Sequence, residues 1–143
     1  MMDDNDILGD HRLGVPEIDS EHALQISVVG AFRSALVRED LEAQRVIFDR
    51  LVDYSNAHFM AEAMMMRLHA YSAAEAHLQE HRKLLDELSE IRRSLGTTSA
   101  LTGEGIADRL DSWFRTHLQS HDRPFAVFLI AASSRPPERL AGR

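Results

Sequence analysis

Residues 77–95 read "HLQEHRKLLDELSEIRRSL" and carry two kinds of side chain on one helical face. The apolar residues recur three or four positions apart, which is the period of an amphipathic α-helix. The stripe consists, in order, of His77, His81, Leu84, Leu88, Ile91 and Leu95. Two histidines therefore lie on the face that this helix should bury, and the fold has to provide partners for them.

Three further segments have the same periodicity. Helices are expected at 19–37 with Asp19 as N-cap, at 40–68, at 72–95 with Ser72 and Glu75 in capping-box spacing, and at 104–122. Four helices of similar length joined by short loops predict an all-α, antiparallel up-down four-helix bundle. We expect this bundle to cover residues 19–132, after an N-terminal lead-in arm at 1–18 and before a mobile tail at 133–143.

Composition excludes several classes of protein. The 143-residue chain has a net charge of -7 and no cluster of Lys and Arg, which argues against a nucleic-acid surface. It contains no cysteine, so a disulfide frame, a thiolate nucleophile and a Cys-type metal site are excluded. No apolar run approaches the roughly 18 residues of a membrane span. The acidic N-terminus lacks the order of a signal peptide, so a cytoplasmic location is expected.

Histidine is the unusual residue, with eight in the chain, and every apolar stripe contains at least one. The polar members of the stripes are His22, His58, Glu62, His77, His81 and His117. Burying one polar group without a partner costs about 1–3 kcal/mol, which is a large part of the roughly 5–15 kcal/mol that stabilises a domain. Imidazoles and carboxylates without thiolate suit iron, manganese or zinc. These ligands exceed the four of one structural zinc ion, so we expect two ions.

The stretch "HLQSHDRP", residues 117–124, leaves one ligand undecided. His121 is four residues after His117 and shares its helical face, whereas Asp122 lies about 140° away on an ideal helix. Pro124 lacks an N–H group and disfavours helical geometry at Arg123, so we expect the helix to end there. At a frayed end the Asp122 side chain can turn inward. Spacing alone therefore favours His121, and the proline favours Asp122.

Taken in order, these motifs resemble the hemerythrins, in particular the single-domain bacterial ones. The resemblance covers about residues 7–129 and rests on four motifs together. They are "GVPEIDSEH" at 14–22, "HFMAE" at 58–62, "HLQEH" at 77–81 and "HLQSHD" at 117–122. Tyr71, before the third expected helix, and Trp113, one turn before His117, are also similar to the family.

The resemblance implies a non-haem di-iron site in the core of the bundle, with an oxo or hydroxo bridge between the ions. It implies that one iron is held by three ligands, His77, His81 and His117. The other would be held by His22 and His58, which leaves an open position for dioxygen or another small diatomic ligand. Glu62 and Asp122 would bridge the two ions, so the family pattern selects Asp122 over His121.

The function that the resemblance implies is reversible dioxygen binding for storage, delivery or sensing. The alternative is a di-iron enzyme or stress protein that acts on peroxide or nitric oxide. A sensor of this size would need a separate protein partner. The expected ligand-pocket residues are Gln25, Phe59, Trp113, Phe114 and Leu118. The family usually has an aliphatic residue where this chain has Gln25. Its amide either contacts a bound ligand, admits water, or points along the groove between helices.

Overall fold

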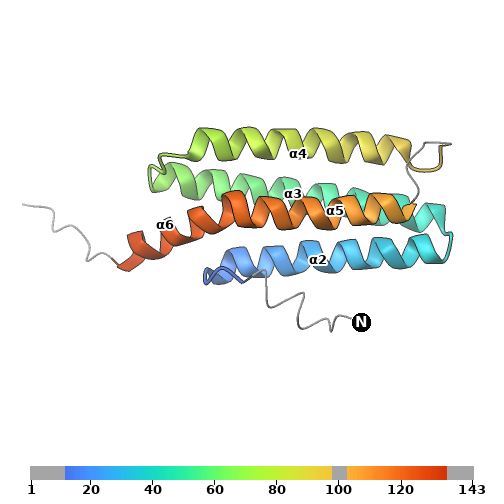
Figure 1. Cartoon of the computed structure of the whole chain (residues 1–143), viewed down its shortest axis with the longest axis horizontal. Helices are drawn as coiled ribbons and strands as arrows, with labels where there is room; N and C mark the ends of the chain where they lie inside the picture. Colours follow the sequence, from blue (N-terminus) through green and yellow to red (C-terminus); the bar gives the residue numbers. More distant parts are fainter. Residues whose placement is uncertain (1–11, 98–102, 135–143) are drawn as a thin grey trace, which may run out of the picture.

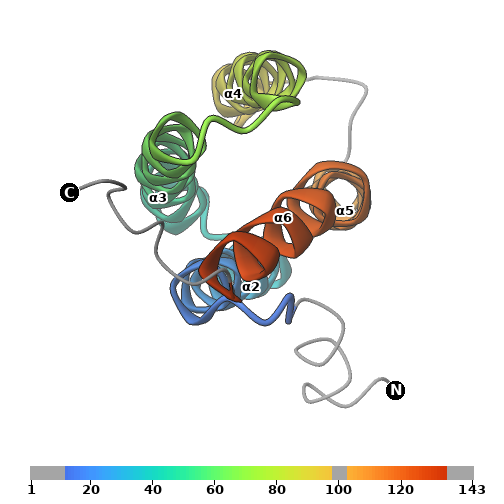
Figure 2. The same ribbon diagram turned by 90° about the vertical axis from the view of Figure 1, so that its left-hand side faces the viewer.

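The computed structural model describes residues 12–97 and 103–134, and within these ranges it contains helices and no strand. The elements are α2 (Pro16–Val37), α3 (Leu41–Leu68), α4 (Ala74–Ser94), α5 (Gly103–His117), a π-helical turn η1 (Leu118–Asp122) and α6 (Arg123–Ser134). The helices α2, α3, α4 and α5 lie side by side (Figure 1) and occupy the corners of a bundle seen end on (Figure 2). The predicted antiparallel four-helix bundle is confirmed. Among the described residues, no helix is long and apolar enough to cross a membrane.

The N-terminal ends of α2 and α3 differ in how they are capped. At the start of α3, which was expected near residue 40, the carboxylate of Asp40 accepts a hydrogen bond from the N–H of Ala43 at 3.0 Å. The prediction that Asp19 caps the first helix is wrong, because α2 begins three residues earlier at Pro16. The Asp19 carboxylate instead accepts hydrogen bonds from the backbone N–H groups of Leu13 at 2.7 Å and Gly14 at 3.2 Å. It therefore ties the lead-in chain to the first turn of α2, and the first helix starts inside the expected arm.

The predicted capping box of α4 is also wrong. This helix begins at Ala74 after Ala73, which makes no side-chain cap, so Ser72 lies one residue too early. The turn before α4 is held by packing instead. The ring of Tyr71 lies with its centroid 4.9 Å from Phe125 and 4.8 Å from that of Phe128, both on α6. Aromatic contacts between segments distant in the sequence thus override a local capping signal.

The chain does not leave the helical path at Pro124, which corrects the expected helix end. In η1 the N–H of Arg123 bonds to the carbonyl of Leu118, five residues back, and Arg123 keeps helical angles of φ -62 and ψ -48. The wider turn accommodates Pro124, whose ring would clash with the carbonyl four residues back in a regular α-helix. The helix α6 then continues to Ser134 and leans across the end of the bundle towards α2 (Figure 2). Ser133 and Ser134 are therefore helical, and the rest of the expected tail lies outside the described residues.

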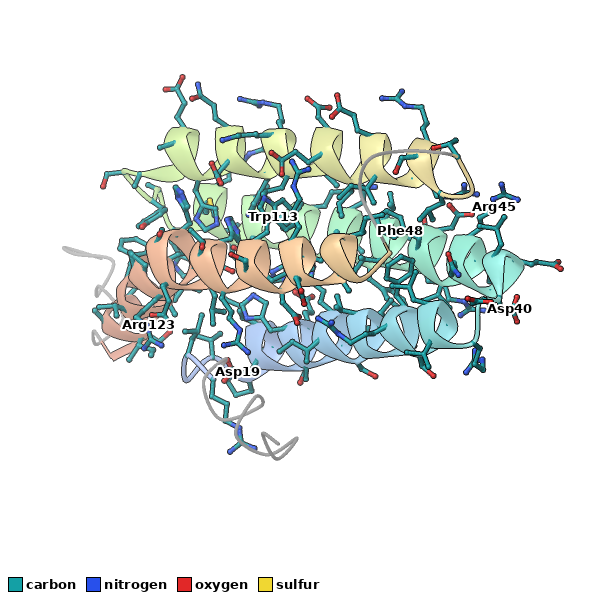
Figure 3. The ribbon with its side chains drawn as sticks, turned by 45° about the vertical axis from the view of Figure 1, so that its right-hand side comes forward. Asp19, Asp40, Arg45, Phe48, Trp113 and Arg123 are labelled. Atoms are coloured by element: carbon teal, nitrogen blue, oxygen red, sulfur yellow. The ribbon has the colours of Figure 1, made fainter. Side chains whose placement is uncertain are left out.

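The apolar core consists of two clusters with a layer of polar side chains between them. The larger cluster contains Phe32, Phe48, Leu51, Leu88 and Leu110, and Phe48 lies between the helices in Figure 3. The smaller cluster lies at the α6 end of the bundle. It is built from Leu13, Ile18, Met66, Leu118, Phe125, Ala126 and Leu129. The helices α2, α3 and α4 have residues in or against both clusters, and α5 reaches the smaller cluster through Leu118 of η1. The polar layer therefore falls at one level of the bundle.

Replacing the cap of α3 tests this account of the fold. We expect Asp40→Ala to lower the free energy of unfolding by about 1 kcal/mol, because the N–H of Ala43 loses its acceptor. Urea unfolding followed by circular dichroism measures this loss. Asp53→Ala, at an exposed position on the same helix, is the control and should change stability by less than about 0.5 kcal/mol. Equal losses in the two variants would contradict the capping role.

Candidate metal centre

The polar layer brings together all seven residues that the family resemblance assigned as metal ligands. His22 comes from α2, His58 and Glu62 from α3, His77 and His81 from α4, His117 from α5 and Asp122 from η1. Each is at most 5% exposed. Imidazole and carboxylate side chains are rarely so buried without a shared partner.

These side chains form two groups of possible ligands. One group contains His77, His81, His117 and Asp122, and the other contains His22, His58, Glu62 and Asp122. Within each group, one nitrogen or oxygen atom per residue lies within 4.8 Å of the others. Asp122 belongs to both groups, so the groups are adjacent.

The two carboxylates lie between the groups and contact both of them. One oxygen of Glu62 contacts Nε2 of His58, and Oε2 lies 3.2 Å from Nε2 of His77. In Asp122, Oδ2 lies 3.1 Å from Nε2 of His22, while Oδ1 lies 3.0 Å and 3.1 Å from Nε2 of His77 and His117. Each carboxylate thus presents one oxygen to each group of histidines, an arrangement suited to a ligand shared by two ions.

Several of these contacts have the distances of hydrogen bonds but not their angles. Both oxygens of Glu62 and the Nε2 atoms of His22 and His58 are buried without a hydrogen bond to any described residue. Leaving such acceptors unsatisfied in a core is unfavourable. A cation among them would satisfy their lone pairs together, and a nitrogen and oxygen donor set without sulfur suits iron, manganese or zinc. The residues present therefore fit a metal centre.

The pKa values of the histidines in the layer depend on their contacts with the carboxylates. Burial alone would lower the pKa of His58, but its contacts with Glu21 and Glu62 raise this pKa to about 10. The pKa of His77 is raised to about 9, because Asp122 and Glu62 outweigh the effect of burial. Burial and the neighbouring His77 lower the pKa of His81 to about 3. Metal ligands have to be deprotonated, so a cation bound in this layer would displace the protons that the carboxylates favour on His58 and His77.

The histidines also keep the carboxylates ionised. Burial would raise the pKa of Asp122, but contacts with His117, His22 and His77 hold it well below its usual value. The pKa of Glu62 is likewise lowered, since His58 and His77 outweigh burial and the nearby Asp122. Two ionised carboxylates in a buried layer add negative charge that favours cation binding.

Glu21 is a residue of the site that the sequence did not reveal. Its carboxylate contacts Nδ1 of His58 on the neighbouring helix, and the opposite ring nitrogen of His58 faces Glu62. A carboxylate in this position fixes the orientation of a ligating imidazole. Glu21 directly precedes His22, but its contact is with another helix, so no spacing rule within one helix indicates it.

His121 lies beside the layer and belongs to neither group of ligand atoms. Its ring is half-buried, with centroids 5.4 Å from those of His117 and His77. In the π-helical turn, hydrogen bonds join residues five apart, so Asp122 and not His121 shares the inward face with His117. The ideal-helix argument for His121 fails because the backbone is not α-helical there.

A cavity of about 690 Å³ reaches the layer between α2 and α5. It is bordered by His22 and His58, and four of the five expected pocket residues line it: Gln25, Phe59, Phe114 and Leu118. Trp113 does not line it. Adjacent residues on a helix point about 100° apart, and Trp113 borders a separate small cavity beside α4.

The amide of Gln25 is anchored within the bundle. Its Nε2 atom donates a hydrogen bond to Oγ of Ser55 at 3.2 Å, and both side chains are at most 4% exposed. Gln25 also lines the cavity. Of the roles considered for this residue, the structure shows an amide fixed to α3 at the wall of the cavity.

A buried layer of imidazoles and carboxylates in a four-helix bundle defines a bundle-type, non-haem metal-binding protein. A sequence profile of the hemerythrin HHE cation binding domain matches residues 13–126, which include every residue of the layer. This chain belongs to the hemerythrin family, whose members bind iron without haem.

Curated relatives agree with this assignment. The chain is 26% identical to bacteriohemerythrin of Stenotrophomonas maltophilia over 121 residues, which cover 82% of this chain and 76% of the relative. It is 25% identical to bacteriohemerythrin of Pseudomonas aeruginosa over 117 residues, covering 79% of this chain and 73% of the relative. Bacteriohemerythrin of Ralstonia nicotianae is 24% identical over 118 residues, with 82% of this chain and 83% of the relative covered.

The two neighbours in η1 provide a matched test of the ligand set. We expect Asp122→Ala to lose most of the bound metal, because both groups lose an oxygen donor. His121→Ala should keep its metal, since His121 supplies no atom to either group. Metal analysis of both purified variants measures this difference, with circular dichroism to show that each remains helical. Metal loss in His121→Ala alone would reverse the assignment.

Proposed function

We propose that this layer binds two iron ions and that the protein binds dioxygen reversibly. The observation that carries the proposal is the position of the two carboxylates, each of which presents one oxygen to each group of histidines. In this assignment His77, His81 and His117 hold one ion. His22 and His58 hold the other, and Glu62 and Asp122 are shared.

The two groups differ in their number of histidines, so an open coordination position is expected at only one of the two ions. One has three histidines and the other has two, so the second ion has fewer protein ligands. The cavity is lined by both histidines of the second group, His22 and His58, but by only one of the three in the first group, His117. A small ligand therefore approaches the side of the centre with the open position. Two ferrous ions held by these residues would supply the two electrons that reversible binding of dioxygen requires.

The remaining residues of this site control its surroundings. Phe59 packs on the ring of His81 with centroids 3.9 Å apart and an angle of 11° between the rings. Together with Phe114 and Leu118 it forms an apolar wall of the cavity. An apolar wall excludes water from the cavity, and this protects a bound ligand from proton transfer. Glu21 orients His58, so the chain fixes an imidazole at the side where the ligand would bind.

The comparisons support the same general function. The relatives are named bacteriohemerythrin, and membership of the family favours a non-haem iron protein that binds oxygen. We assign this chain a role in oxygen storage, delivery or sensing.

One spectroscopic experiment tests the proposal. Protein loaded with ferrous iron without oxygen should contain two iron ions per chain. Exposure to oxygen should produce a coloured form, and removal of oxygen should restore the original spectrum. A colourless protein with a single zinc ion would contradict the proposal. Catalytic consumption of peroxide without a reversible oxygenated spectrum would favour an enzyme instead.

The anchored amide of Gln25 gives a prediction for the lifetime of the oxygenated form. We expect Gln25→Leu to slow autoxidation, because an aliphatic side chain removes a polar group that can hold water in the cavity. The decay of the oxygenated absorption in air measures the rate. Ser55→Ala is the control, since it removes the partner of Gln25 but keeps the amide. Unchanged decay in Gln25→Leu would show that the amide does not admit water.

A further inference from the structure

The cavity beside the candidate metal centre is an elongated groove between α2 and α5. Its inner end is marked by the contact of His22 with Asp122, and its outer end by that of Arg33 with Asp111. These contacts are separated by eleven residues of α2, a length of about 16 Å at 1.5 Å per residue. We call this feature the α2–α5 groove.

The α2–α5 groove is much larger than dioxygen requires. Its volume is about 690 Å³, which lies within the range of about 300–1,000 Å³ that is usual for sites of small organic molecules. A diatomic ligand resembles one water molecule in size, and water takes about 30 Å³ in the liquid. The groove therefore has space for an elongated organic ligand in addition to a small ligand at the metal.

The lining of the groove combines an apolar inner part with a cation at its rim. Phe59, Phe114 and Leu118 line the inner part. Arg115 lines the groove on α5, is exposed, and makes no ion pair or hydrogen bond with any residue that the structure describes. Arg33 differs, because its guanidinium is bonded to Asp108 at 3.1 Å and Asp111 at 2.7 Å. Arg115 is thus a cation free to bind a ligand, and Arg33 closes the outer end.

We propose that the α2–α5 groove binds an amphipathic monocarboxylate, such as the anion of a medium-chain fatty acid. The carboxylate binds the guanidinium of Arg115, and the hydrocarbon chain lies against Phe114, Leu118 and Phe59. Arg115 and Asp122 are seven residues apart, about 10 Å along a helix. A chain of that reach ends beside His22 and His58 and lies across the path of a small ligand to the metal centre.

Calorimetry on the iron-loaded protein tests this binding site. We expect octanoate, whose extended chain has a similar reach, to bind saturably at one site. Acetate has the carboxylate but no chain, and should not bind in the same concentration range. 1-Octanol has the chain without the charge and should bind about tenfold more weakly, the effect of losing one charge-assisted contact. Acetate binding equal to octanoate would show that carboxylates bind the metal only, and would overturn the proposal.

Substitutions at Arg115 and Gly30 test separately the charge that binds the carboxylate and the groove volume that holds the hydrocarbon chain. Arg115→Gln should bring the affinity for octanoate down to that for 1-octanol, and an unchanged preference for octanoate would overturn the role of Arg115. Gly30 lines the groove, and a Cβ atom placed there meets no atom within 4 Å. Gly30→Leu should therefore fill the groove and abolish binding of both ligands, while Gly30→Ala controls for the change in helix propensity. Full octanoate binding in Gly30→Leu would place the ligand elsewhere and overturn the proposal.

The same samples distinguish this proposal from the proposed function. The visible spectrum with and without oxygen is recorded for each variant beside the calorimetric titration. Reversible oxygenation without octanoate binding would overturn the groove site alone. Saturable octanoate binding that depends on Arg115 supports the groove site even if oxygenation is absent.

Discussion

Glu62 and Asp122 are ionised carboxylates buried among five histidine rings, and each of the helices α2, α3, α4 and α5 contributes a histidine that contacts them. Isolated charges in such a layer would be strongly unfavourable, so the contacts have to form together. This requirement fixes the register of the helices, because each must place its imidazole at the same level. Arg33 and Asp111 form a second contact between α2 and α5, about three helical turns from this layer. The contacts that build the site therefore also determine how the helices of the bundle are aligned with one another.

The π-helical turn serves both the site and the fold. A hydrogen bond across five residues brings Asp122 onto the face of His117, which a regular helix would not do. The same turn passes Pro124 without a break and redirects α6 over the end of the bundle. Phe125 and Leu129 then close the smaller apolar cluster on that side of the layer. A single backbone irregularity thus brings Asp122 into the buried layer and places α6 over the end of that layer.

Local periodicity was sufficient to predict the helices and the histidine layer, since residues four apart reveal which face each helix buries. Local signals were less reliable at helix ends: Asp40 caps α3, whereas Asp19 and Ser72 do not act as caps. At those ends, contacts with distant segments compete with the capping preference. The sequence indicated four residues that line the α2–α5 groove, but neither the length of this groove nor the contact of Glu21 with His58 could be predicted. Both depend on which helices face each other and how closely they pack. The spacing of residues along one helix does not indicate either property.

The division of the apolar core has a consequence for how the apoprotein acquires its metal. The larger cluster joins α2, α3, α4 and α5 at the end away from α6 and includes none of the ligands. The bundle can therefore stay assembled at that end while the smaller cluster, with α6, opens by local fluctuation. A cation would then reach the buried layer by local opening of the bundle at the α6 end, while the larger cluster stays packed.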